Sequence, residues 1–405
     1  MRSRRIVLGL LVLAALSAGC STSSVVTFGD LRYTISKPTA YRNLAVYVIR
    51  GVDRLKGRKV LTLDEGIKQK TLVISETSNV GQLQVENKSK DEYVYLQSGE
   101  IVKGGKQDRT LRYDYIVPPM SGRRPLQSFC VESARWSGRG SESTAKFSAG
   151  KYVPTVAARS NNINSFGNNA LTWSEVSRTQ LSYGRNIMWS VKDAKSPTSM
   201  QLTLEHAKVK ATTKEYTDAV RAAFDRYNDA IGFAYAINGT VQWVDVYASG
   251  ELFRKLLPKL LDASAQEAII ELQKGKAFSA PSARAVRKFM LAARQGKVTE
   301  RRVSDDIKSW VQDSKKGMYF QIFSAGPDKK WTSFHEGYSR KVDKVEPKKR
   351  GRRLPLPDTI QIDDLRQQPN RNDADRRHTR PNALIPDGDA DDILNWDLWT
   401  PEPGD

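Results

Sequence analysis

The chain has 405 residues, a formal net charge of +20 and two cysteines. Its length suits one large domain or two smaller ones, and its positive charge favours partners that carry negative groups. The sequence lacks a nucleic-acid recognition motif, a G-x-S-x-G motif, a phosphate-binding loop and histidines at metal-ligand spacing, so we expect no nucleic acid, metal or cofactor.

The first 19 residues have the features of a signal peptide. Three arginines precede an apolar stretch of about 13 residues, which is too short for a bilayer that requires roughly 20. The stretch ends in L-S-A-G-C, with small residues directly before Cys20. This ending resembles the lipobox of bacterial lipoproteins, which implies removal of residues 1–19 and a lipid on Cys20. The alternative is a soluble secreted protein with an accidental cysteine at this position.

The lipid on Cys20 determines the expected location. Ser21 follows it instead of aspartate, and by the same resemblance this favours the outer membrane, facing the periplasm, in a Gram-negative cell. No later segment approaches the length of a transmembrane helix, so the lipid is the only predicted anchor. Residues 20–40, which include a serine- and threonine-rich run, are predicted to be a lipidated spacer between the membrane and the domain.

Residues 41–340 are predicted to form an α+β domain with two unlike halves. The first half, about residues 40–136, is β-rich, because short β-branched and aromatic runs alternate with polar or glycine-containing turns. A polar stretch over residues 137–169 is predicted to be mainly loop. The second half, about residues 168–340, mixes helices and strands.

The second half contains the clearest local signals. Asn238-Gly239 lies between two strand-like runs and is the strongest hairpin signal in the chain. Amphipathic spacing predicts helices beginning near Thr212 and Glu251, with Pro258 expected to kink or restart the second. Strand-like runs at 318–324 and 331–338 complete the domain.

From Lys341 the composition changes. Proline, aspartate, arginine and asparagine dominate, and large apolar residues are sparse. Such a segment cannot bury enough apolar surface to offset the entropy lost on folding. Residues 341–405 are therefore predicted to be a disordered charged tail, basic at its start and acidic at its end.

Specific polar residues recur inside the strand-like half. They belong to four pieces of sequence: L-T-L-D-E-G from Leu61, G-E-I-V-K-G-G-K-Q-D-R from Gly99, C-V-E-S-A-R-W from Cys130 and A-I-N-G from Ala236. Together they resemble the ARG and rhodanese-phosphatase-superfamily associated protein domain, over roughly residues 40 to 275. Asp108 stands where that family usually has asparagine, and Gly105 where it has alanine. The family name records genomic neighbours, including ADP-ribosylglycohydrolases, so the resemblance implies an association with ADP-ribose-like ligands and not a known reaction.

Two chemical hypotheses fit these residues. In the first, Glu100 and Glu132 face one cleft as an acid and a base or nucleophile, as glycoside-type hydrolysis requires. The residues predicted to hold a ligand around them are Asn87, Lys106, Gln107, Arg109 and Arg135. In the second, Cys130 is a nucleophile activated by Arg135. The structural alternative is that Cys130 is a buried small residue and that Glu132 and Arg135 form an ion pair.

The best interpretation is an envelope-tethered protein whose α+β domain binds a ligand at this polar cluster, with no demonstrated catalysis. The expected partners are the membrane, through the lipid, and an anionic small molecule or anionic envelope polymer. A hydrolase of phosphorylated or glycosidic small molecules is the enzymatic alternative, and a purely structural envelope protein is the third hypothesis. Carboxylates within roughly 5 to 10 Å of each other and open to a pocket would favour the hydrolase.

Overall fold

The computed structural model describes residues 24–342, except residues 56, 57, 78, 134, 164–168, 327 and 328. The predicted signal peptide, the lipid on Cys20 and all but the first two residues of the predicted tail lie outside the described residues. The described part combines helices with mainly antiparallel sheets, so the α+β prediction is confirmed. In this part of the chain no helix is both long and apolar enough to cross a bilayer.

The largest sheet contains ten strands of the described part, with the hairpin of β14 and β15 inside it. The hairpin turns at Asn238-Gly239, as predicted, and both residues have the positive φ (52° and 77°) that a type I′ turn requires. The strand order is β1-β2-β4-β14-β15-β19-β18-β17-β16, and β3 pairs with β4. The strands are β1 (Val25–Phe28), β2 (Leu31–Ile35), β3 (Thr39–Tyr41), β4 (Leu44–Arg50), β14 (Ala230–Ile237), β15 (Thr240–Tyr247), β16 (Lys297–Ser304), β17 (Ile307–Asp313), β18 (Gly317–Ala325) and β19 (Trp331–Arg340).

Two smaller sheets carry most of the family-like motifs. One has the order β13-β9-β10-β12-β7-β6, and the other has the order β11-β8-β5, in which β5 and β8 are parallel. The strands are β5 (Val60–Thr62), β6 (Leu72–Glu76), β7 (Gln82–Asn87), β8 (Tyr93–Leu96), β9 (Glu100–Gly104), β10 (Arg109–Leu111), β11 (Tyr115–Val117), β12 (Arg123–Cys130) and β13 (Phe147–Tyr152).

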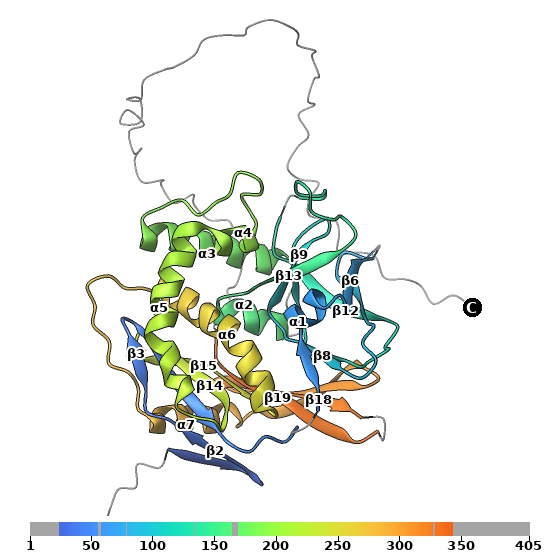
Figure 1. Cartoon of the computed structure of the whole chain (residues 1–405). Helices are drawn as coiled ribbons and strands as arrows, with labels where there is room; N and C mark the ends of the chain where they lie inside the picture. The colour runs from blue at the N-terminus through green and yellow to red at the C-terminus, as the bar shows by residue number, and fades with distance from the viewer. Residues whose placement is uncertain are drawn as a thin grey trace, which may run out of the picture. The chain divides into compact units, whose positions relative to one another are not determined.

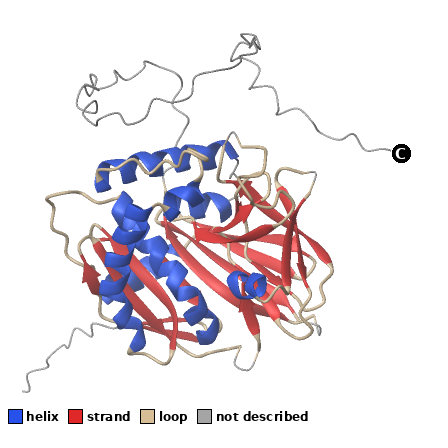
Figure 2. Ribbon diagram, turned by 45° about the horizontal axis from the view of Figure 1, so that its top comes forward, coloured by secondary structure: helices blue, strands red, loops and turns tan. Residues whose placement is uncertain are grey.

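The longer helices lie together, with strands on either side of them (Figure 2). α5 begins five residues before the predicted start at Thr212, because His206 caps it by accepting a hydrogen bond from the backbone N–H of Lys208. α6 continues through Pro258 without interruption. The helices are α1 (Leu63–Lys68), α2 (Val156–Ile163), α3 (Asn169–Ile187), α4 (Met200–Glu205), α5 (Ala207–Asp225), α6 (Gly250–Ile270) and α7 (Ala283–Ala293).

Both faces of the large sheet are covered at β14. Phe233 and Tyr235 pack into one core, which α5 and α6 complete, and α5 and α6 lie side by side in front of the sheet (Figure 1). The alternate residues Ala234 and Ala236 pack into a second core on the opposite face, against α7. Every residue of β14 is therefore buried, and the strand shows no polar and apolar alternation.

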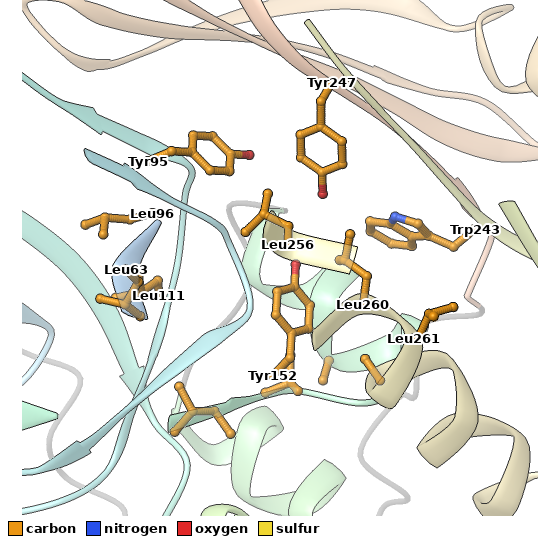
Figure 3. Close-up of a cluster of buried hydrophobic side chains, with 14 of the residues drawn as sticks. Leu63, Tyr95, Leu96, Leu111, Tyr152, Trp243, Tyr247, Leu256, Leu260 and Leu261 are labelled. Carbon is orange, nitrogen blue, oxygen red and sulfur yellow. The ribbon is translucent and has the colours of Figure 1, made fainter. Parts of the chain in front are cut away.

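α6 joins the large sheet to the smaller ones. Its Leu256 and Leu260 lie between Trp243 and Tyr247 of β15 and Tyr152 of β13 (Figure 3). Truncating a fully buried leucine to alanine typically costs 2 to 5 kcal/mol, so this contact fixes α6 firmly. The next residue after Pro258 on this helix, Lys259, is thereby held against β9, where Glu100 lies.

Three segments differ from the sequence-based predictions. Residues 25–41, most of the predicted spacer, form β1, β2 and β3. The predicted loop over 137–169 contains β13 and α2, and β16 and β17 were not predicted. β1, β2 and β3 are short strands that are recognisable mainly through their pairing with one another or with β4, and β16 is mostly exposed, so the residues of these strands carry a weak pattern.

Candidate functional site

Two chain segments bring buried charges together beside the six-stranded sheet. The turn between β9 and β10 carries Asp108, and the segment after β12 carries Glu132, Arg135 and Arg139. The backbone joins the two, because the N–H of Val131 donates to the carbonyl of Asp108 at 3.0 Å. We call Asp108, Glu132, Arg135 and Arg139 the buried charge network, since each is at most 9% exposed.

Within this network each carboxylate is paired with both arginines. Arg135 Nε donates to Glu132 at 2.7 Å, and Arg139 donates twice to Asp108, at 3.0 and 3.1 Å. Arg139 also donates to Glu132 at 3.3 Å, and Arg135 lies 3.5 Å from Asp108. Burial alone would raise the pKa of Glu132, but hydrogen bonds from Arg135 and Ser196 outweigh burial and lower it. Glu132 is therefore ionised at neutral pH.

Asp108 occupies the position where the family-like motif usually has asparagine. Its carboxylate accepts hydrogen bonds from Arg139, from the backbone N–H of Gly104 at 3.0 Å and from the hydroxyl of Ser199 at 3.0 Å. An asparagine side chain has one acceptor oxygen and could not accept both bonds from a guanidinium. The aspartate is thus matched to Arg139 in this chain.

Arg139 connects the network to a surface cavity of about 380 Å³. Across the cavity lining, Lys103 of β9 contacts Glu205 at 2.8 Å and Glu142 at 3.6 Å. The buried Nε of Arg139 has no hydrogen-bond partner among the described residues. We call this space the Arg139 cavity; it is lined by Lys103, Arg139, Gly140, Ser141, Glu142, Asp193, Lys195, Leu202, Glu205 and His206.

Gln107, Arg109 and Cys130 form a separate buried cluster. Arg109 donates to Gln107 Oε1 at 3.0 Å and to the sulfur of Cys130, and it lies 3.7 Å from Glu76. Burial raises the pKa of the Cys130 thiol to about 11, so the thiol is protonated at neutral pH. The cation beside it is Arg109 and not Arg135, which the sequence-based hypothesis had named. This geometry supports a structural role for Cys130 and not a nucleophilic one.

Glu100 lies in a third arrangement, on the side of β9 that faces α6. Its carboxylate accepts from Lys259 Nζ at 2.9 Å and from the backbone N–H of Gln97 at 2.8 Å. Lys259 also lies 2.5 Å from Asp64, so the motifs that begin at Leu61 and Gly99 meet on one lysine. Burial raises the pKa of Glu100, and Lys259 opposes that shift.

Asn87 and Lys106 do not join these clusters. The amide of Asn87 donates to the backbone carbonyls of Glu92 and Val117, and its oxygen accepts from the backbone N–H of Ser89. Through these three bonds to backbone groups, Asn87 links the end of β7 to β11 and to the turn before β8. Lys106 is exposed, and its backbone N–H donates to Glu76.

The two predicted catalytic carboxylates have pKa values shifted in opposite directions, which is the pattern of an acid and base pair. However, Glu100 and Glu132 are both fully buried, share no hydrogen-bond partner among the described residues and do not line the Arg139 cavity. A glycosidase-type pair must flank its substrate and leave room for water. The geometry therefore favours ligand binding beside Arg139 over hydrolysis by this pair.

A further charged network lies deep in the core, between the large sheet and the three-stranded sheet. His335 contacts Asp114 through Nδ1 at 2.7 Å and Asp245 through Nε2 at 3.0 Å, and its ring stacks on Tyr247. Burial alone would lower the pKa of His335, but the two aspartates outweigh it and raise the pKa to about 9. In the described residues no group of three histidine, cysteine, aspartate or glutamate side chains is placed to hold a metal ion.

Sequence reasoning missed Arg139, although it lies only seven residues after Glu132. Ser196 and Ser199 also donate to the network. They lie more than sixty residues after Glu132 in the chain, between α3 and α4. The only local signal was an arginine inside a glycine- and serine-rich stretch, which is typical of an ordinary loop.

All four family-like sequence motifs lie within the part of the chain that matches a known protein family. A sequence model of the ARG and Rhodanese-Phosphatase-superfamily-associated Protein domain matches residues 32–324, which is more than half of the chain. Searches of curated proteins and of solved structures gave no significant match. The chain therefore belongs to the ARG and Rhodanese-Phosphatase-superfamily-associated Protein domain family.

Proposed function

We propose that the chain is a lipid-anchored protein of the bacterial cell envelope whose family domain binds a polar small molecule, or a segment of an envelope polymer, in the Arg139 cavity. The position of Arg139 carries this proposal. Its side chain is 4% exposed and is held by Asp108, Glu132 and Glu142, yet it forms part of the cavity wall. A guanidinium fixed in this way holds its positive charge at a defined place in the wall, and little side-chain entropy is lost when a ligand binds beside it.

The charges around the cavity narrow the class of ligand. Its lining contains three basic residues (Lys103, Arg139 and Lys195) and three acidic residues (Glu142, Asp193 and Glu205). The wall therefore offers both hydrogen-bond donors and acceptors, and its lysine, arginine and carboxylate charges balance. Such a wall suits hydroxyl and amide groups, as in a saccharide fragment, better than a bare anion.

Filling the cavity should abolish ligand binding without unfolding the domain. Ser141 is exposed and lines the cavity, so Ser141→Trp should block it, whereas Ser177→Trp, on the exposed face of α3, should not. The measurement is the stabilisation of the detergent-solubilised full chain by peptidoglycan disaccharide fragments, compared with ADP-ribose. A ligand at 100 times its Kd should add about 2.7 kcal/mol to the unfolding free energy of the parent and of Ser177→Trp only. Equal stabilisation of Ser141→Trp would contradict the proposal.

The lipid anchor is tested separately. A signal peptide followed by Cys20 supports it, and two or more acyl chains bind a bilayer stably because each buried methylene contributes about 0.8 kcal/mol. In a bacterial host, Cys20→Ser should lose labelling by radioactive palmitate and leave the membrane fraction. Cys130→Ser is the matched control and should remain labelled. Labelling that persists in Cys20→Ser would end the lipoprotein proposal.

A further inference from the structure

A second cavity, of about 310 Å³, lies between α5 and α6, which run side by side (Figure 1). It shares no lining residue with the Arg139 cavity. The helix spacing of three, four and seven residues places the α5 contributors on one face, and the two α6 contributors lie one turn apart. We call it the α5–α6 cavity; it is lined by Lys151, Leu204, Lys210, Ala211, Thr213, Lys214, Thr217, Asp262 and Gln266.

Two polar side chains of this cavity are buried, and each has an oxygen atom without a hydrogen-bond partner among the described residues. Thr213 is 3% exposed and Gln266 is 2% exposed. Thr213 Oγ1 and Gln266 Oε1 have no hydrogen-bond partner among the described residues. Buried polar atoms in native proteins almost always have a partner, so two such atoms in one cavity wall indicate that a bound molecule completes them.

The charge of the α5–α6 cavity differs from that of the Arg139 cavity. Three lysines and one aspartate line it, so the wall has a net charge of +2. Asp262 forms an ion pair with Lys151, with 3.4 Å between Lys151 Nζ and Asp262 Oδ2. Lys214 is paired with Asp218, which is exposed and does not line the cavity. Lys210 and Lys214 are therefore the cations that no residue of the wall neutralises.

We propose that the α5–α6 cavity binds a hydroxylated phosphomonoester, of the size of a sugar phosphate. Lys210, Lys214 and the hydroxyl of Thr213 bind the phosphate, whose charge of about −1.5 to −2 at pH 7 is opposite in sign to that of the wall. A hydroxyl group of the ligand donates to Gln266 Oε1. The cavity volume lies at the lower end of the range for small-molecule sites, which suits a ligand of this size. This inference is independent of the proposed function, because it concerns a different cavity.

The test is calorimetric titration of the detergent-solubilised full chain with glucose 6-phosphate, inorganic phosphate and glucose. Glucose 6-phosphate should bind most tightly, because it alone carries both a phosphate for the lysines and hydroxyl groups for Gln266. The double variant Lys210→Ala/Lys214→Ala should weaken its binding by about tenfold or more. The matched control removes the same charge at exposed Lys315 and Lys316, between β17 and β18, and should bind as the parent does.

Gln266→Leu separates a ligand contact from a structural role. Because Gln266 Oε1 has no partner in the protein, this nearly isosteric change should leave the melting temperature unchanged or raised. It should also remove the preference for glucose 6-phosphate over inorganic phosphate. Equal affinity in the two double-lysine variants would overturn the proposal. So would binding to phosphatidic acid vesicles without binding to glucose 6-phosphate, since the phosphate would then come from a lipid. Ser141→Trp should bind glucose 6-phosphate normally, so failure at one cavity is distinguishable from failure at the other.

Discussion

Replacing Glu132 with glutamine should lower the free energy of unfolding by about 3 to 5 kcal/mol. Glu132 is fully buried and accepts hydrogen bonds from Arg135, Arg139, Ser196 and the backbone N–H of Asp108. The neutral amide keeps the shape of the side chain but leaves two buried arginines facing one carboxylate. Its NH₂ group also meets donors where the carboxylate accepted them. Urea unfolding of the full chain at pH 7 measures the loss.

Glu142→Gln is the matched control for this prediction. Glu142 also pairs with Arg139, at 3.0 Å, but its side chain is 26% exposed. Because the side chain is partly exposed, water screens its charge more than that of Glu132, so the same substitution should cost less, about 1 kcal/mol. If Glu132→Gln unfolds at the same urea concentration as the parent and only ligand binding is lost, Glu132 is a binding residue and not a structural one.

The family-like motifs predicted part of this arrangement. The G-E-I-V-K-G-G-K-Q-D-R piece lies in a region predicted to be β-rich and forms two paired strands, and Glu132 and Arg135 form the ion pair of the structural alternative. The predicted common cleft of Glu100 and Glu132 stays a prediction, because the two carboxylates are buried and share no hydrogen-bond partner among the described residues. Glu100 faces Lys259, which lies 159 residues later in the chain, and no local pattern predicts such a contact. Strand periodicity tells which residues share a face, but not which helix covers it.

The site itself was harder to predict than the fold. Arg109 was expected to hold a ligand, but the chain folds it over Cys130 and Gln107, away from the Arg139 cavity. The cavity instead uses Lys103 and Lys195, which have no unusual sequence context. Hydrophobic and turn patterns are local, and they predicted the hairpin at Asn238-Gly239 and the helices α5 and α6. The pairing of buried charges depends on contacts between distant segments, and a single sequence does not contain that information.

The unfolding free energy should fall by about 1 kcal/mol per pH unit between pH 7 and pH 9 because of His335. The pKa of His335 is raised from 6.5 in the unfolded chain to about 9 in the folded one. Within this interval the folded protein holds a proton that the unfolded chain releases. The stabilisation is therefore fully present below about pH 6.5 and is lost as the pH rises through 9. In total it amounts to roughly 3 kcal/mol.

This pH interval separates His335 from the other buried groups. Burial raises the pKa of Glu267 from 4.5 to about 7, so its contribution changes mainly below pH 7 and little above pH 8. The Cys130 thiol, with a pKa raised from 9.0 to about 11, contributes mainly above pH 9. Urea unfolding at pH 7, 8 and 9 therefore reports mainly on His335.

Two variants identify the cause of the slope. Asp114→Asn removes the carboxylate that the structure places at 2.7 Å from His335 Nδ1, so it should lower the histidine pKa and flatten the slope. His206→Gln removes a histidine that caps α5 and lines the Arg139 cavity but does not contact His335, so it should lower stability slightly and leave the slope unchanged. An unfolding free energy in the parent that does not change from pH 7 to pH 9 would show that His335 is neutral in the folded protein.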